Sequence, residues 1–182
     1  MGRVKGGKIS NKLAFLKDNY SEAMVRQVID SMDSFDQLAL KIILDTAWYE
    51  IELYDRLMKA ICKIAAGGDE SVYTRIGRYS AEQSFTTVYK AFRGKDPEDL
   101  LRKMVSMHAM RNDPADMKIV HREAKHCEVR IVEPRSTVAI CKVAHAFYIR
   151  AIELCGASDV RVKETSCSGK GQPFCQFDLR WN

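Results

Sequence analysis

The hydrophobic pattern of this chain changes once, at Asp113-Pro114, and that change limits what the chain can fold into. Before this point apolar residues recur every three or four positions, a spacing that is typical of amphipathic helices. Residues 51–65 are an example, with apolar side chains along one face. After it, β-branched residues partly alternate with polar ones, which predicts strands. We expect one helix at 138–154 between two strand pairs, at 118–123, 127–133, 160–166 and 174–181. This order indicates an α+β fold, with an N-terminal helical layer packed on a small twisted antiparallel sheet.

Start and stop signals divide the helical part of the sequence. Ser21 is a suitable N-cap for a second helix, and a third follows it through Leu38, Ile42 and Ile43. Gly67-Gly68 ends the long helix that begins near residue 51, and Asp69 then caps the next one. Asp96-Pro97 is a strong start signal, a cap followed by proline at the first helical position. Ser136 is the predicted cap of the helix at 138–154.

Length and composition indicate one ordinary domain. The chain has 182 residues, of which 46% are hydrophobic and 29% charged, as in a globular core. No internal repeat or linker divides it, so we expect a single domain over 1–182, made of an N-terminal arm or helix (1–20), a helical part (21–113) and a sheet part (114–182). No stretch approaches the roughly 18 consecutive apolar residues of a membrane span. The start carries no secretory signal, so a cytoplasmic location is expected.

The small basic excess does not indicate a nucleic-acid-binding protein. The formal net charge is +5, and the basic residues are scattered rather than clustered with aromatic ones. Only the first 20 residues form a basic amphipathic segment. We expect this arm to pack on a partner protein or on a second copy of the chain, which makes a homodimer the expected assembly.

Six cysteines in a reducing compartment favour metal binding over disulfides. Cys167 and Cys175 flank the last hairpin loop, so antiparallel pairing brings their thiols together. Glu164 lies at the same strand end, and Cys141 is in the first turns of the preceding helix. Three thiolates and a carboxylate form a closed tetrahedral set, and such a set holds a structural rather than a catalytic zinc.

Other interpretations of the cysteines remain open at this stage. Free cysteine is among the most buried residue types, so all of them can be core residues. His145 lies one helical turn beyond Cys141, and Cys155 ends the same helix, so either is an alternative donor. Cys62 and Cys127 have no partner at ligand spacing and are interpreted as packing residues.

The C-terminal segment resembles a known family, the 4-vinyl reductase domain. The resemblance is carried by Val160-Arg-Val-Lys-Glu-Thr-Ser-Cys-Ser-Gly-Lys-Gly-Gln-Pro-Phe-Cys-Gln-Phe177 and by the Leu-Cys-Gly-Ala stop at 154–157. In phenol-responsive transcriptional activators that share this module, zinc is held by Cys, Glu, Cys and Cys. The resemblance therefore implies the same four zinc ligands, Cys141, Glu164, Cys167 and Cys175.

The rest of the chain, through four motifs, resembles an uncharacterised family best known from myxobacteria. The motifs lie at 48–57, 67–69, 77–82 and 87–92. This resemblance implies the fold shared by haem nitric-oxide-binding sensors and vesicle-tethering transport-particle subunits, with a ligand cavity between helices and sheet. Fold alone does not define function.

We therefore expect a non-catalytic module that binds a small, hydrophobic molecule, has a regulatory role and is stabilised by a structural zinc. The sequence has no dinucleotide fingerprint and no catalytic constellation, so no catalytic residue is predicted. Aromatic residues at helical spacing and one histidine on an apolar helix face are the candidate pocket residues: Trp48, Tyr49, Tyr89, Phe92 and His108.

Two alternatives remain open. One is a haem-dependent gas sensor that uses His108, which lies about where the proximal histidine falls in the haem nitric-oxide family. The Tyr-x-Ser-x-Arg motif of that family is missing, and its nearest counterpart is Ile-Val-Glu-Pro-Arg-Ser at 131–136. The other alternative is a protein-interaction or scaffold module without a ligand.

Overall fold

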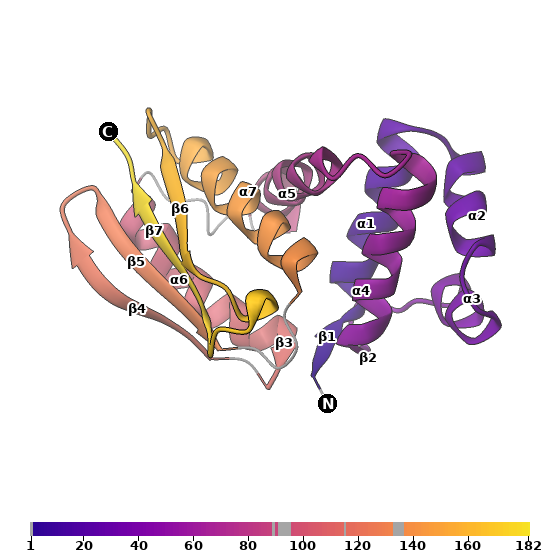
Figure 1. Cartoon of the computed structure of the whole chain (residues 1–182). Coiled ribbons are helices and arrows are strands. Elements are labelled where there is room, and N and C mark those ends of the chain that lie inside the picture. Colours follow the sequence, from indigo (N-terminus) through magenta and orange to yellow (C-terminus); the bar gives the residue numbers. More distant parts are fainter. Residues whose placement is uncertain (1, 89, 91–95, 115, 133–136) are drawn as a thin grey trace.

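The computed structural model describes residues 2–88, 90, 96–114, 116–132 and 137–182. The helices are α1 (Gly6–Asn19), α2 (Glu22–Asp30), α3 (Ser34–Lys41), α4 (Ile51–Ala60), α5 (Ser71–Gln83), α6 (Pro97–Arg111) and α7 (Val138–Leu154), with π-helical extensions η1 (Ile61–Ala65) and η2 (Ser84–Val88). The larger sheet, with α6 and α7 beside it, lies on one side of the molecule, and α1–α4 lie on the other side (Figure 1).

The larger sheet is antiparallel, with the strand order β4-β5-β7-β6. Its strands are β4 (Asp116–Glu123), β5 (His126–Val132), β6 (Arg161–Ser166) and β7 (Cys175–Arg180), and a short 3-10 turn, η4 (Ser168–Lys170), lies between the last two. Alternate residues of β5 and β7 are buried against α6 and α7, and the residues between them form an outer face of the sheet.

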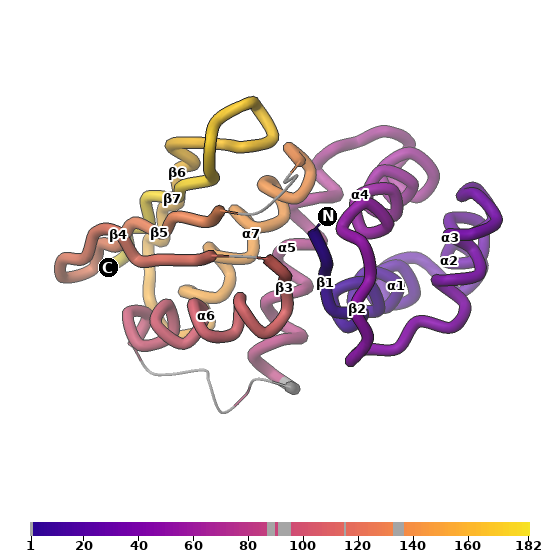
Figure 2. Tube along the Cα trace, turned by 90° about the horizontal axis from the view of Figure 1, so that it is seen from below, coloured from indigo at the N-terminus to yellow at the C-terminus, as the bar shows by residue number. Residues whose placement is uncertain are grey.

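A second, small sheet joins the two sides of the molecule. The strand β1 (Arg3–Lys5) pairs with β2 (Trp48–Glu50) on one edge and with β3 (Asn112–Asp113) on the other, both antiparallel. Figure 2 shows β1 between the start of α4 and the end of α6. The N-terminus is therefore part of the fold, and buried Ile9, Phe15 and Leu16 place the apolar face of α1 in the core of its own chain.

Helices α5 and α7 pack closely where the two sides of the molecule meet (Figure 1). Gly77 makes this approach feasible, because a Cβ there would stand 2.4 Å from the backbone oxygen of Val143 and 2.7 Å from Cβ of Ala146. One core cluster lies among α1–α5 and the start of α7, and the other lies between the sheet and α6 and α7.

The expected α+β fold is confirmed, and the helix signals agree with the structure in most places. Ser21 and Asp96 cap α2 and α6 through their side chains, and Asp69 accepts from the backbone N–H of Ser71 at the start of α5. The cap of α7 is Thr137, whose hydroxyl accepts from the backbone N–H of Ile140. Ser136, the predicted cap, lies outside the described residues.

Two differences concern the N-terminal half. The small sheet was not predicted, because three strands of two or three residues are too short to show a period of two. The third helix ends at Lys41 and leaves Ile42 65% exposed. Within the described ranges, no helix is both long enough and apolar enough to cross a membrane.

Candidate functional site

The four predicted metal ligands converge at the junction of α7 with the last hairpin. Cys141 lies in the first turn of α7, Glu164 on β6, Cys167 directly after β6, and Cys175 at the start of β7. One donor atom from each residue lies within 4.8 Å of the donors of the other three. The three cysteines are buried and Glu164 is half-buried.

The sulfur separations suit a shared metal ion better than a disulfide. Cys141 Sγ lies 3.2 Å from Cys175 Sγ and 3.5 Å from Cys167 Sγ. A disulfide requires about 2.05 Å, whereas sulfurs around tetrahedral zinc, with Zn–S near 2.3 Å, stand about 3.8 Å apart. All six cysteines are free thiols.

The surroundings of the cluster also suit a bound cation. Glu164 Oε1 is buried and has no hydrogen-bond partner within the described part of the chain, while Oε2 lies 3.5 Å from Lys170 Nζ. Burial raises the pKa of the Cys167 thiol, and the neighbouring Glu164 raises it further. A bound zinc ion would reverse this effect, because it deprotonates a thiol that it coordinates.

The backbone of the hairpin loop holds the cluster against α7. The backbone N–H of Ser168 donates to Cys175 Sγ at 3.4 Å and so fixes the position of this sulfur. At Gly169 a Cβ would stand 2.6 Å from the backbone nitrogen of Val138, so only glycine lets the loop approach the start of α7 this closely.

The structure does not bring the alternative donors into the cluster. His145 Nε2 contacts the backbone oxygen of Val162 at 2.8 Å. Cys155 lies at the opposite end of α7 from Cys141. Cys62 and Cys127 are buried in the two core clusters, in keeping with their interpretation as packing residues.

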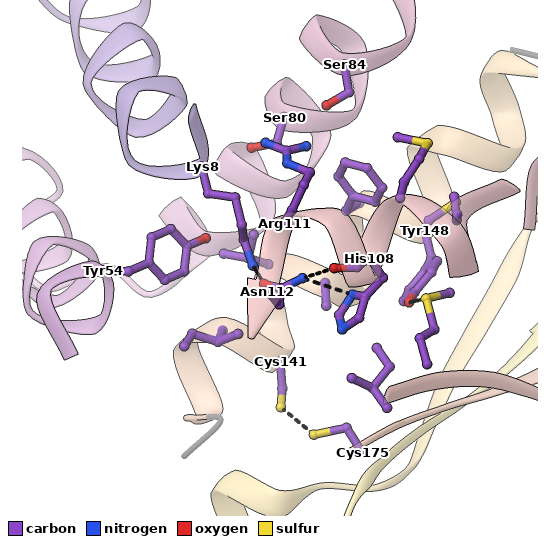
Figure 3. Close-up of a pocket in the computed structure, with 18 of the residues that line it drawn as sticks. Lys8, Tyr54, Ser80, Ser84, His108, Arg111, Asn112, Cys141, Tyr148 and Cys175 are labelled. Carbon is purple, nitrogen blue, oxygen red and sulfur yellow. Dashed lines mark hydrogen bonds between the residues drawn. The ribbon is translucent and has the colours of Figure 1, made fainter. Parts of the chain in front are cut away.

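A cavity of about 160 Å³ lies next to the cysteine cluster, between α1, α5, α6, α7 and the sheet. Cys141 and Cys175 belong to its wall as well as to the cluster (Figure 3). Most of its wall is apolar, formed by Tyr54, Met104, Met107, Met117, Ile131, Ile140, Val143, Ala144, Phe147, Tyr148 and Phe177.

The polar end of the cavity carries positive charge. Lys8, Lys12 and Arg111 line it, and the described lining residues include no aspartate or glutamate. Lys12 is 3% exposed and donates to Ser80 Oγ at 2.6 Å and to Asn11 Oδ1 at 2.9 Å. Burial lowers the pKa of Lys12 well below its usual value, and the charges of Lys8 and Arg111 lower it further.

Of the predicted pocket residues, His108 lines the cavity. Trp48 and Tyr49 lie on β2 and are not part of its wall. Trp48 instead lies under Lys5, whose Nζ is 4.1 Å from the ring centroid, and the Tyr49 hydroxyl accepts from the backbone N–H of Leu44. Tyr89 and Phe92 lie outside the described residues.

The cationic end of the cavity was missed in the sequence, although α1 contains a signal for it. Lys12 stands three residues after Ile9 and four before Leu16, on the apolar face of the helix. A charged residue on such a face is almost never fully buried without partners. It therefore indicates a polar site inside the fold.

No family model matches the chain, and no curated protein matches it in sequence. Solved structures do match it. An H-NOX protein from K. algicida in the Fe(II) unliganded state aligns with 98% of this chain and 96% of its own, at 12% identity and a TM-score of 0.69. An H-NOX protein from S. oneidensis in the Fe(II)NO state covers 98% and 99%, at 10% identity and a TM-score of 0.71.

A third match is an oxygen-binding H-NOX domain related to soluble guanylate cyclases, with 12% identity, a TM-score of 0.76 and coverage of 98% of this chain and 95% of that one. The chain has the H-NOX fold. The fold expected from the myxobacterial resemblance is thereby confirmed. With no family or sequence match, the likeness to 4-vinyl reductase domains stays a resemblance of the C-terminal segment.

The cavity of this H-NOX fold does not fit a haem. About 160 Å³ is close to the volume of a cavity that holds one benzene ring, whereas haem joins four pyrrole rings in one macrocycle. Asn112 Nδ2 donates to the backbone oxygen of His108 at 2.9 Å and lies 3.3 Å from its Nδ1, while Asn112 Oδ1 accepts from Lys8. Nδ1 of His108 is then an acceptor, and Nε2 carries the proton. In a histidine that binds a metal through Nε2, the protons are placed the other way round: Nε2 carries no proton, and Nδ1 donates to a neighbouring group.

Proposed function

We propose that this chain is a non-catalytic sensor module that binds a small molecule in its internal cavity and is stabilised by a structural zinc. The observation that carries the proposal is the cavity of about 160 Å³, with apolar walls, one cationic end and two cysteines of the cluster in its wall. Mostly apolar pockets with a few convergent polar groups are the usual binding sites for small molecules.

The size and charge of the cavity define a ligand class. An engineered cavity of about 150 Å³ with apolar walls binds benzene, so this one suits a molecule of about one six-membered ring. Lys8, Lys12 and Arg111 favour an anionic group at one end, because an anion there would offset the cost of burying the charge of Lys12. The proposed ligand is a monocyclic, apolar molecule with a carboxylate or similar oxygen group.

Zinc has a structural role in this proposal. Cys141, Glu164, Cys167 and Cys175 would hold it and pin the last hairpin to α7. Since Cys141 and Cys175 also face the cavity, the metal fixes one wall of the ligand site. Free thiols are required for this, which a reducing, cytosolic compartment provides.

The ligand class is tested by calorimetry with benzoate, benzyl alcohol and toluene. We expect benzoate to bind most tightly, and Lys12→Met to weaken benzoate at least tenfold while toluene binding stays within threefold. Ala144→Phe should fill the cavity and abolish binding of all three, and Ala23→Phe, on exposed α2, should change nothing. If none of the three compounds binds, or if the Ala144 variant binds them as well as the wild type, the cavity is not the site.

A haem-dependent gas sensor is the second candidate. It is supported by the H-NOX matches, which include iron(II), nitric oxide and oxygen complexes, and by the position of His108 in the cavity wall. It requires a wider cavity and the other tautomer of His108. We expect no Soret band after incubation of the protein with haemin; a Soret band that His108→Ala removes would put this candidate first.

We also propose that the protein forms a homodimer, but the interface in this proposal is not the N-terminal arm expected from the sequence. The arm is buried in its own chain, whereas α3 and the turn after it expose Phe35, Leu38, Ile42 and Leu44 at 85, 61, 65 and 64%. Exposed apolar side chains that gather in one segment often mark a protein interface. We expect light scattering to show a dimer that Phe35→Ser, with Phe35→Leu as the control, converts to a monomer; a monomeric wild type at tens of micromolar would contradict this.

A further inference from the structure

A second cluster of metal-binding side chains lies on the outer face of the larger sheet. His121 on β4 and His126 at the start of β5 have ring centroids 4.9 Å apart, with Glu123 between them in sequence. The cluster is at the opposite end of β5 from Ile131, which pairs with Cys175. It is therefore separate from the cysteine site and from the cavity.

A β-bulge places His121 on this face. Ile119 pairs with Val129, but the next pair is His121 with Glu128, so β4 advances two residues while β5 advances one. With regular pairing His121 would share the helix-facing side of Ile119. Bulges commonly redirect a side chain in this way.

The same shift sets the faces of the residues beyond the bulge. Glu123 lies directly opposite His126, on the face that His121 now shares. Arg122, between them, faces the helices and pairs with Glu98 of α6 at 3.0 Å.

The donor atoms have separations that one metal ion can bridge. His121 Nε2 lies 3.3 Å from Glu123 Oε1, and His126 Nδ1 lies 3.9 Å from Glu123 Oε2. One donor atom from each of the three residues lies within 4.8 Å of the others. Ligands around tetrahedral zinc, with Zn–N of 2.0–2.1 Å, stand about 3.3 Å apart.

Asp178 on β7 sets the orientation of His126. Its Oδ2 lies 3.2 Å from His126 Nε2, and its Oδ1 accepts from Arg180 Nε at 2.9 Å. As a carboxylate paired with Arg180, Asp178 accepts from His126, so the imidazole proton lies on Nε2 and the lone pair of Nδ1 faces His121 and Glu123. A histidine that binds a metal usually donates its other ring N–H to a carboxylate in this way.

We propose that His121 Nε2, Glu123 and His126 Nδ1 bind a divalent transition metal ion, with Asp178 as a positioning residue. Two imidazoles and one carboxylate suit Zn²⁺, Ni²⁺ or Cu²⁺ rather than Mg²⁺ or Ca²⁺. Glu123 and His121 are largely solvent-accessible, with side chains 67% and 40% exposed. A metal ion held by these three residues would therefore be accessible to water.

Calorimetry with Zn²⁺, on protein whose cysteine site already holds one equivalent, tests the proposal. We expect a second equivalent to bind at micromolar concentrations. His121→Gln should weaken it at least tenfold, and Asp178→Asn, which keeps all three ligands, about 10–100-fold. Asp116→Asn, at the other end of β4, is the matched control and should bind as the wild type does. Binding of only one equivalent in total, or equal binding by the His121 variant, would overturn the proposal.

Imidazole ¹⁵N spectra provide a second, independent readout. Before zinc is added, His126 should show its proton on Nε2. The second equivalent should shift Nδ1 of His126 and Nε2 of His121, while the resonances of His108 and His145 stay in place. Zinc binding at Nε2 of His126 would instead indicate a site with Glu128 and Asp178, which also lie near this nitrogen, and would refute the ligand set proposed here.

Discussion

Cys141 Sγ, in the first turn of α7, lies 3.2 Å from Cys175 Sγ at the start of β7. The two residues are 34 positions apart in sequence, and both also line the internal cavity. Whatever holds these sulfurs together therefore fixes the last hairpin on α7 and one wall of the proposed ligand site. The first prediction concerns this connection.

Removal of the metal, or Cys175→Ser, should destabilise the protein strongly. A structural zinc contributes about 10 kcal/mol or more of apparent folding free energy, and for a domain of this size 1 kcal/mol shifts the melting temperature by about 2–4 °C. We expect a decrease of at least about 10 °C in calorimetry and loss of the bound zinc by mass spectrometry. Cys62→Ser, in the core away from the cluster, should keep its zinc. A Cys175 variant with full zinc and unchanged melting would contradict the metal site.

Thiol alkylation should depend on the metal. Cys127 is buried in the core, and this burial raises its pKa to about 11, so almost none of it is thiolate at pH 8. With zinc bound, we expect iodoacetamide to modify Cys155, which is half-buried, before any other cysteine. After a chelator removes the metal, we expect peptide mass spectra to show that Cys141, Cys167 and Cys175 are modified as well. Cys127 should stay unmodified until the protein unfolds. The same three cysteines reacting equally with and without the chelator would argue against coordination.

Lys12→Met should stabilise the free protein. Lys12 is 3% exposed, and burial of its ammonium costs free energy that its contacts with Ser80 and Asn11 only partly offset. An apolar side chain of similar length avoids this cost, and we expect a gain of about 1–3 kcal/mol at pH 7 in urea unfolding. Lys59→Met, on a side chain 65% exposed, is the control and should change stability by less than about 0.5 kcal/mol.

The pH dependence of this gain has a definite sign. The pKa of Lys12 is lower in the folded protein than its ordinary value of 10.5, so the unfolded chain binds the proton more tightly. Below the folded pKa the cost is complete, and between the folded pKa and 10.5 the stability of the wild type rises with pH. The Met variant should lack this rise, so the difference between the two proteins shrinks as the pH approaches 10.5. A difference that is constant over this range would show that Lys12 is charged without cost.

The sequence predicted the α+β class and three of the four converging donors, Glu164, Cys167 and Cys175, because these depend on local pattern. Helix caps such as Ser21 and Asp96 act within one turn, and a hairpin fixes which residues of its two strands meet. Cys167 and Cys175 therefore had to be neighbours once their hairpin formed. Only the approach of Cys141 needed tertiary packing, which the close fit of the loop at Gly169 provides.

The cavity could not be predicted in the same way. Its wall combines α1, α5, α6, α7 and the sheet, and no local period shows which of their faces meet. Aromatic residues such as Trp48 were expected there, but the pairing of β2 with β1 takes this residue to another surface. Likewise, His121 gave no signal, because the bulge that turns it toward His126 is defined only by pairing with β5.

Gly77→Ala should disrupt the packing of α5 on α7. A Cβ at Gly77 would lie 2.4 Å from the backbone oxygen of Val143 and 3.0 Å from the backbone nitrogen of Phe147, and backbone atoms cannot turn aside as a flexible side chain can. The helices must separate, and overpacking of this kind costs about 1–3 kcal/mol or more. Gly7→Ala is the matched control, because its Cβ would meet only ordinary contacts at 3.6–3.7 Å, within a helix that favours alanine. We expect chemical unfolding to show a loss for Gly77→Ala and no loss for Gly7→Ala. Since Val143 and Phe147 also line the cavity, benzoate binding should weaken in Gly77→Ala and stay unchanged in Gly7→Ala. Equal stability of the two variants would show that α5 and α7 are not closely packed at Gly77.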